Sequence, residues 1–292
     1  MDLSGILAPV LTATVAWFVS TGAILWLDRR PRAAWAMSLH FVSLLAIAAA
    51  VTAWSVADQT TPWAAYHGFM CALILWGWHE LAFLMGYITG PRRTPLPPGV
   101  RGLARFKAAT ATVIHHELAI VITLAALVAA TWGQPNQTAT LTFAALTVLR
   151  LSAKFNIFLG VPGLDPAMMP DHLAYLATYF RTSPSNPLLP VSLLAATAAT
   201  VLAAGQGLEA PAGSGARTGW MLVATLIGLG LLEHLFLILP FKDGTLFAWA
   251  MGGEAARPGS EQNREDIRTA GSETQCPFPR VQEPVFPLVK TD

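Results

Sequence analysis

The chain has 292 residues, of which 54% are hydrophobic and only 12% are charged. Because soluble domains usually carry about 25% charged residues, this composition excludes an ordinary soluble enzyme, a disordered chain and a coiled coil. The net charge of +1 excludes the global basic field of a nucleic-acid-binding protein, and two cysteines exclude a disulfide scaffold. The composition predicts an all-α integral membrane protein.

Apolar segments long enough to cross a bilayer recur along the chain, separated by polar, Pro- and Gly-containing breaks. A membrane helix needs about 20 mostly apolar residues. We therefore predict a bundle of about seven transmembrane helices. The predicted spans lie at roughly 3–27, 33–57, 62–88, 108–132, 138–159, 188–205 and 219–240.

The distribution of Lys and Arg predicts the orientation of these spans. Arg29, Arg30 and Arg32 lie in the first loop and five further basic residues follow the third span, whereas the second and fourth loops have none. Because positively charged loops stay in the cytoplasm, we expect the N-terminus outside and the C-terminus inside.

Two segments lie outside the predicted spans. Between the fifth and sixth spans, the stretch at about 170–181 begins with Pro170 and Asp171 and has an apolar stripe, which predicts a short interfacial helix. We divide the chain into a transmembrane domain at 1–252 and a polar tail at 253–292, which is expected to be flexible and cytoplasmic.

Three carboxylates lie well inside the predicted spans, and each is adjacent to a histidine: Glu80, Glu117 and Glu233. A rise of about 1.5 Å per residue, counted from each predicted cytoplasmic helix end, places these groups in one layer of the membrane. His67 is about 18 Å away on the same helix as His79, so we expect a packing role for it. The candidate metal ligands of the layer are His40, His79, Glu80, His115, His116, Glu117, His172, Glu233 and His234.

Three interpretations of this layer are open. Carboxylate and imidazole ligands on facing helices are typical of a two-metal centre, and iron is the expected metal. Alternatively, Arg150 and Lys154 neutralise the glutamates in a structural network. In the third interpretation, one histidine is an axial ligand of haem or of a chlorophyll magnesium. Metal ligation accounts best for clustered carboxylates and imidazoles inside a membrane.

Several sequence blocks carry a resemblance to a known family. They are Gly77–Phe83 with Gly86, Thr89–Arg92, His115–Ala119, Leu151–Val161, Asp171–Leu176 and Leu232–Phe236. These blocks resemble the PuhE family of photosynthetic complex assembly proteins, which are encoded beside reaction-centre genes in purple bacteria. The resemblance implies a multi-pass protein of the bacterial inner or intracytoplasmic membrane with a role in bacteriochlorophyll-containing complexes.

Together, the layer and the resemblance predict an oxygen-dependent oxidase with two irons per chain. Its expected substrate is a magnesium porphyrin, as in the oxidative cyclase step on magnesium-protoporphyrin IX monomethyl ester. Arg150 or Lys154 would bind a substrate propionate, although snorkelling toward the membrane surface is an equal expectation. The alternative is a non-catalytic assembly factor or pigment chaperone for reaction-centre or light-harvesting proteins. The expected partners also include membrane lipid and exclude nucleic acid.

Overall fold

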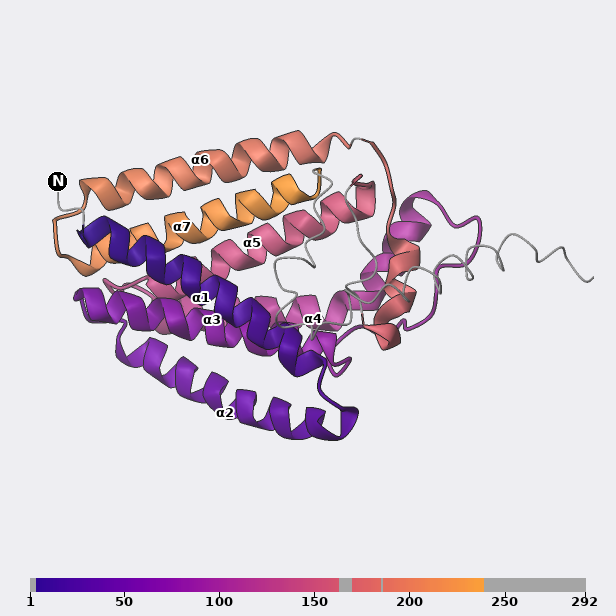
Figure 1. Cartoon of the computed structure of the whole chain (residues 1–292), viewed down its shortest axis with the longest axis horizontal. Helices are drawn as coiled ribbons and strands as arrows, with labels where there is room; N and C mark the ends of the chain where they lie inside the picture. Colours follow the sequence, from indigo (N-terminus) through magenta and orange to yellow (C-terminus); the bar gives the residue numbers. More distant parts are fainter. Residues whose placement is uncertain (1–3, 163–169, 185, 239–292) are drawn as a thin grey trace, which may run out of the picture. The chain divides into compact units, whose positions relative to one another are not determined.

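The computed structural model describes residues 4–162, 170–184 and 186–238, and the regular structure within these ranges is helical. The long helices are α1 (Ser4–Asp28), α2 (Arg32–Ser55), α3 (Pro62–Leu84), α4 (Gly102–Thr131), α5 (Thr138–Leu159), α6 (Leu188–Glu209) and α7 (Gly215–Phe236). They lie side by side as a bundle (Figure 1), which confirms the predicted all-α membrane architecture.

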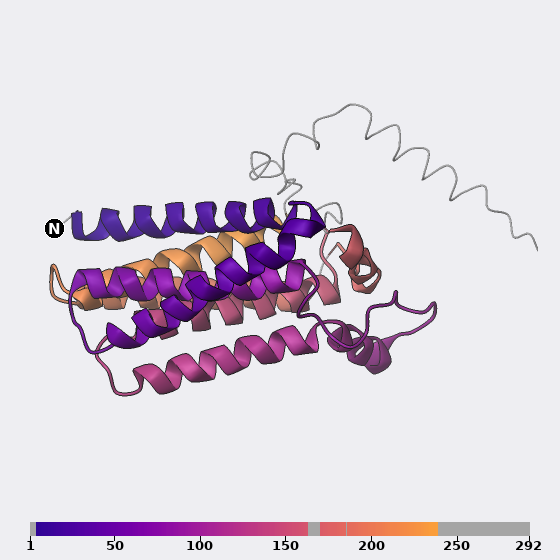
Figure 2. The ribbon, with the colours of Figure 1, turned by 90° about the horizontal axis from the view of Figure 1, so that it is seen from below.

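Helix α3 lies at the centre of the bundle. It packs against α1, α2, α4, α5 and α7, and more than half of its residues are buried. Among the described residues, the six other long helices are the ones long and apolar enough to cross a membrane by length and composition. Helix α3 carries polar groups such as His79 and Glu80, which are buried against neighbouring helices instead of meeting lipid. Protein therefore surrounds much of α3, the third predicted span (Figure 2).

Small residues allow the helices to approach closely, as is usual where lipid cannot drive helix association. Ala46, Ala49 and Ala53 of α2 are buried in one apolar cluster with residues of α3, α4 and α5. A Cβ added to Gly68 of α3 would lie 3.2 Å from the Ala139 backbone nitrogen of α5. The packing at the centre of the bundle therefore requires the backbones of neighbouring helices to lie close together.

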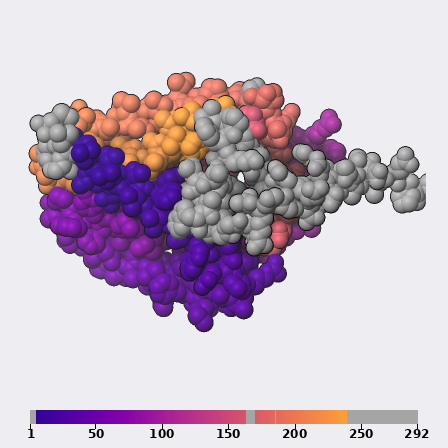
Figure 3. Space-filling view, in the orientation of Figure 1, coloured from indigo at the N-terminus to yellow at the C-terminus, as the bar shows by residue number. Residues whose placement is uncertain are grey.

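Large apolar side chains cover the outer faces of the helices. On α6, Val191, Leu194, Val201 and Leu202 are each more than half exposed. Helices α6, α7 and α1 follow one another across the face seen in Figure 3. In an aqueous protein such faces would favour aggregation, whereas acyl chains solvate them in a membrane.

Several predicted boundaries need correction. Helix α3 ends at Leu84 instead of residue 88, and α4 begins at Gly102 instead of residue 108. The first turns of α4 contain Arg105 and Lys107, which continue the helix beyond its apolar part. The predicted interfacial helix forms as the 3-10 helix η2, Asp171–Tyr179. The predicted tail at 253–292 lies outside the described residues.

The predicted orientation leads to a direct test. An odd number of crossings puts the two chain ends on opposite sides of the membrane, with the C-terminus inside by the positive-inside rule. We expect a reporter that matures only in the cytoplasm to be active when it is fused after Ala255. Activity of a reporter that requires the periplasm at this position would show that α3 does not cross or that the orientation is reversed.

Candidate functional site

The buried carboxylate of α3 forms an ion pair with α5. Arg150 Nη2 donates a hydrogen bond to Glu80 Oε2 at 3.0 Å. The Glu80 side chain is 10% exposed, whereas that of Arg150 is 45% exposed. His116 Nε2 of α4 lies 3.9 Å from Glu80 Oε1. This contact brings three helices together at one point.

A second ion pair forms one helical turn further along α5. Lys154 Nζ donates to Glu117 Oε1 of α4 at 2.5 Å, and both side chains are about one quarter exposed. Because Arg150 and Lys154 are four residues apart, they project from the same side of α5 toward the carboxylates of α3 and α4. The two predicted substrate-binding cations therefore contact glutamates, as the network interpretation requires.

Helix α7 adds a third carboxylate from another side. Trp17 Nε1 of α1 donates to Glu233 Oε1 at 3.1 Å, and Arg150 lies within electrostatic range of Glu233, Glu80 and Glu117. The adjacent His234 is buried, with Nδ1 2.8 Å from the Gly230 carbonyl oxygen and Nε2 3.0 Å from Ser152 Oγ. Both ring nitrogens of His234 are therefore occupied.

The histidines between α3 and α4 keep unpaired atoms. His79 Nε2 lies 2.9 Å from Thr123 Oγ1, and the ring centroids of His79 and His116 are 6.5 Å apart. Half of the eight buried side-chain atoms that make no hydrogen bond in the described part of the chain lie here: His79 Nδ1, Glu80 Oε1 and both ring nitrogens of His116. A buried polar atom without a partner is costly, so this is the polar spot of the bundle that is least satisfied.

The loop after α3 holds α4 in place at this spot. His116 N donates to the Thr89 carbonyl oxygen and Arg92 N donates to the Ala111 carbonyl oxygen, both at 3.0 Å. Gly90 lies between these contacts, and a Cβ there would be 2.3 Å from the Ala111 oxygen. In the sequence, this segment is a Pro- and Gly-containing break between spans and one of the blocks of the family resemblance. Neither feature predicted its contact with the α4 backbone.

Three predicted ligands do not join the buried cluster of Glu80, His79 and His116. His172 Nε2 is 2.7 Å from the Leu84 carbonyl oxygen, so it caps the end of α3, where carbonyl groups lack helical partners. His115 is exposed on α4, and His40 is exposed on α2 with Nδ1 2.5 Å from the Ala36 carbonyl oxygen. Their depth was compatible with the layer, but the rotation of each helix directs these side chains elsewhere.

As they are arranged in the structure, the described residues do not fit a centre of two metal ions. Within the described ranges, no group of three or more His, Cys, Asp or Glu side chains is placed to hold a metal. Arg150 and Lys154 already neutralise two of the carboxylates. Excess negative charge, the feature that would attract divalent cations, is therefore largely removed. The geometry favours a neutralised network, and the iron centre stays a prediction.

The fold and this network define a polytopic α-helical membrane protein with ion pairs inside its bundle. The chain belongs to the DUF3623 family, which is described as a protein family of unknown function and whose model matches residues 3–257. It is also 37% identical over 245 residues to an uncharacterized 30.4 kDa protein in the puhA 5′ region of Rhodobacter capsulatus. That match covers 82% of this chain and 89% of the relative. No solved structure matches the chain.

Proposed function

We propose that this protein is a photosynthesis-related membrane protein that assists, without catalysis, the assembly of pigment-containing complexes. Its relative from the puhA 5′ region of Rhodobacter capsulatus supports the photosynthetic context. The bacterial inner or intracytoplasmic membrane is the corresponding location, and reaction-centre or light-harvesting proteins are the corresponding partners.

The pairing of the intramembrane carboxylates carries the non-catalytic part of this proposal. Each of the three carboxylates receives a donor from another helix: Arg150 for Glu80, Lys154 for Glu117 and Trp17 for Glu233. These contacts join α5 to α3, α5 to α4, and α1 to α7. Such pairing stabilises one arrangement of helices, which is what a scaffold for assembly requires.

The test uses a Rhodobacter capsulatus strain that lacks the gene of the relative and receives this chain in trans. We expect the deletion to lower the absorbance of assembled pigment–protein complexes without accumulation of a magnesium-porphyrin precursor, and this chain to restore the absorbance. Accumulation of such a precursor in the deletion strain would instead indicate an enzyme of pigment synthesis and would overturn the proposal.

The oxygen-dependent oxidase is the second candidate, and one observation favours it. His116, His79 and Glu80 keep buried atoms without hydrogen-bond partners, and nitrogen and carboxylate oxygen are ligand types that iron accepts. No group in the described ranges is placed to hold a metal, so these three side chains and the predicted ligand Glu117 would have to rearrange to bind one, which would supply the redox chemistry. Arg150 would have to release Glu80 before its carboxylate could be fully available.

Glu117→Gln separates the two candidates. In the assembly proposal, the freshly purified wild type contains no stoichiometric iron, and Glu117→Gln changes only the pairing with Lys154. We expect this variant to remain folded in the membrane, with a thermal transition lowered by a few degrees and unchanged metal content. His67→Gln is the control, since among the described residues His67 bonds only to the Trp63 carbonyl oxygen of its own helix. About two irons in the wild type, lost selectively in Glu117→Gln, would establish the oxidase.

A further inference from the structure

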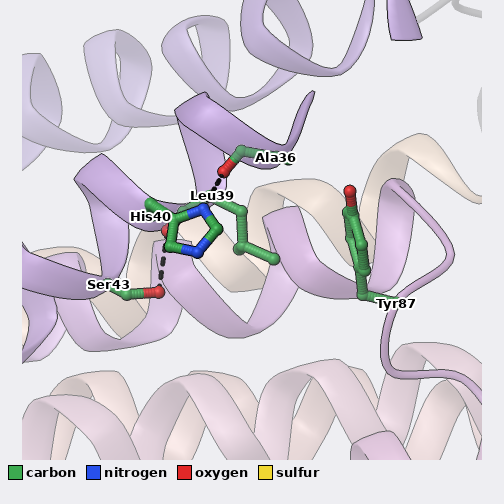
Figure 4. Close-up of a pocket in the computed structure, with 5 residues that line it drawn as sticks. All are labelled: Ala36, Leu39, His40, Ser43 and Tyr87. Atoms are coloured by element: carbon green, nitrogen blue, oxygen red, sulfur yellow. Dashed lines mark hydrogen bonds between the residues drawn. The ribbon is translucent and has the colours of Figure 1, made fainter. Parts of the chain in front are cut away.

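His40 occupies an unusual position for a histidine of a membrane helix. It lies eight residues after Arg32, the first residue of α2, and its side chain is exposed on the outer face of the bundle. It borders a pocket of about 120 Å³ whose other lining residues are Ala36, Leu39, Ser43 and Tyr87 (Figure 4). The ring therefore lies on a face that lipid is expected to cover, where a polar group without a partner is costly.

The hydrogen bond to the backbone decides which ring nitrogen is available. Nδ1 lies 2.5 Å from the Ala36 carbonyl oxygen, which can only accept, so the proton of the neutral imidazole is on Nδ1. Nε2 then carries an unprotonated lone pair on the other side of the ring, and no described residue hydrogen-bonds to it. A histidine whose Nδ1–H is held by a carbonyl group is oriented for metal ligation through Nε2.

The surroundings of His40 limit the kind of metal. A bare ion needs several protein ligands, and no group of three or more His, Cys, Asp or Glu side chains that could hold one occurs in the described ranges. Ser43 is already engaged, because its hydroxyl donates to the Leu39 carbonyl oxygen and accepts from Trp78 Nε1. A single imidazole is sufficient only for a metal whose other positions are filled by a macrocycle.

The helix face around His40 has room for a flat ring. At about 100° per residue, Ala36 and Ser43 flank His40 on one side, and Met37 and Leu44 flank it on the other. The first two are small and leave the pocket open, while Met37 and Leu44 are 78% and 67% exposed and offer apolar contact. Tyr87 lies across the pocket from the histidine (Figure 4).

We propose that His40 Nε2 is an axial ligand for the metal of a lipid-soluble metallotetrapyrrole that binds against the outer face of α2. A coordinate bond forms from the Nε2 lone pair to the metal, and neither oxidation nor proton release accompanies it. The site is separate from the Glu80–Arg150 network. The inference rests on the proposed assembly role for its biological purpose. It adds to that role a ligand of the pigment class.

His67 provides a matched comparison. It is also exposed on a long helix, and its Nδ1 lies 2.7 Å from the Trp63 carbonyl oxygen. It is, however, only five residues from Pro62 at the start of α3, or about 7.5 Å along the axis, so it lies nearer the membrane surface. His40 lines the pocket of about 120 Å³ on α2, and His67 does not line that pocket.

The test is a titration of the purified full chain in lipid nanodiscs with zinc protoporphyrin IX, followed by absorbance and fluorescence. We expect the spectral shift of axial imidazole ligation in the wild type and in His67→Leu. His40→Leu should lose this shift and bind about tenfold or more weakly. In His40→Gly, added imidazole should restore the shift. Metal-free protoporphyrin IX, which has no metal to ligate, should bind wild type and His40→Leu equally.

Two results would overturn this inference. One is a zinc protoporphyrin spectrum and affinity that are the same in His40→Leu as in the wild type. The other is equal binding of the zinc and metal-free rings to the wild type, which would indicate apolar adsorption only. If zinc protoporphyrin IX shows no axial ligation but the chain still restores the pigment complexes of the Rhodobacter capsulatus deletion strain, the ligand site alone is rejected. If axial ligation is observed but the chain does not restore those complexes, the assembly role alone is rejected.

Discussion

Gly90→Ala is expected to destabilise the folded protein by about 3 kcal/mol, which is at the upper end of the usual cost of overpacking. The added Cβ would lie 2.3 Å from the Ala111 oxygen and 2.6 Å from the Thr112 carbonyl carbon. Both atoms belong to the α4 backbone, so no side-chain rotation relieves the clash. The loop would have to move away from α4 and release the hydrogen bond from His116 N to the Thr89 oxygen.

The measurement is thermal unfolding of the purified protein in detergent. Gly205→Ala is the matched control, because a Cβ at Gly205 of α6 would meet no atom within 4 Å. Alanine is also the better helix former by about 1 kcal/mol, so the control should be at least as stable as the wild type. Equal stability of the two variants would mean that the loop does not hold α4 as closely as described.

Arg150→Met is expected to cost about 3 kcal/mol, because it leaves the Glu80 carboxylate buried without its cation. Glu80 is 7% exposed as a residue, and its Oε1 atom already has no hydrogen-bond partner. The double variant Glu80→Gln/Arg150→Met removes both charges together. It should recover most of the loss, because replacing a complete buried pair is often close to neutral.

A double-mutant cycle on thermal or denaturant unfolding measures this coupling. Lys107→Met is the control, since Lys107 is an exposed cation of α4 with no ion pair to any described residue. It should change stability by less than about 0.5 kcal/mol. If the stability losses of the two single variants add up in the double variant, Glu80 and Arg150 do not act as a pair.

The residues that form the network were largely predictable from their depth. Glu80, Glu117, Arg150 and Lys154 were placed near one layer, and the structure joins them into two ion pairs. The depths themselves contained errors, because α3 ends earlier and α4 begins earlier than the apolar runs suggested. A helix can extend beyond the membrane without a change in its backbone, so hydropathy locates the membrane part of a helix better than its ends.

The sequence could not show whether the buried glutamates and histidines bind a metal or form structural ion pairs and hydrogen bonds. Lipid-facing and protein-facing side chains are both apolar in membrane helices, so periodicity gives little information on helix rotation. The outward positions of His40 and His115 therefore became visible only in the folded bundle. The same holds for the contact of His172 with the Leu84 carbonyl oxygen, which joins segments 88 residues apart.

By itself, the sequence determined that this is a helical membrane protein and where its apolar segments lie, because bilayer thickness imposes a length and a polarity that can be counted along the chain. It also placed charged groups at similar depths. The tertiary structure decided which of these groups meet, that Arg150 and Lys154 neutralise the carboxylates, and that Gly90 contacts the α4 backbone. These outcomes depend on the rotation and close approach of helices, which are set by packing between segments that are distant in the sequence.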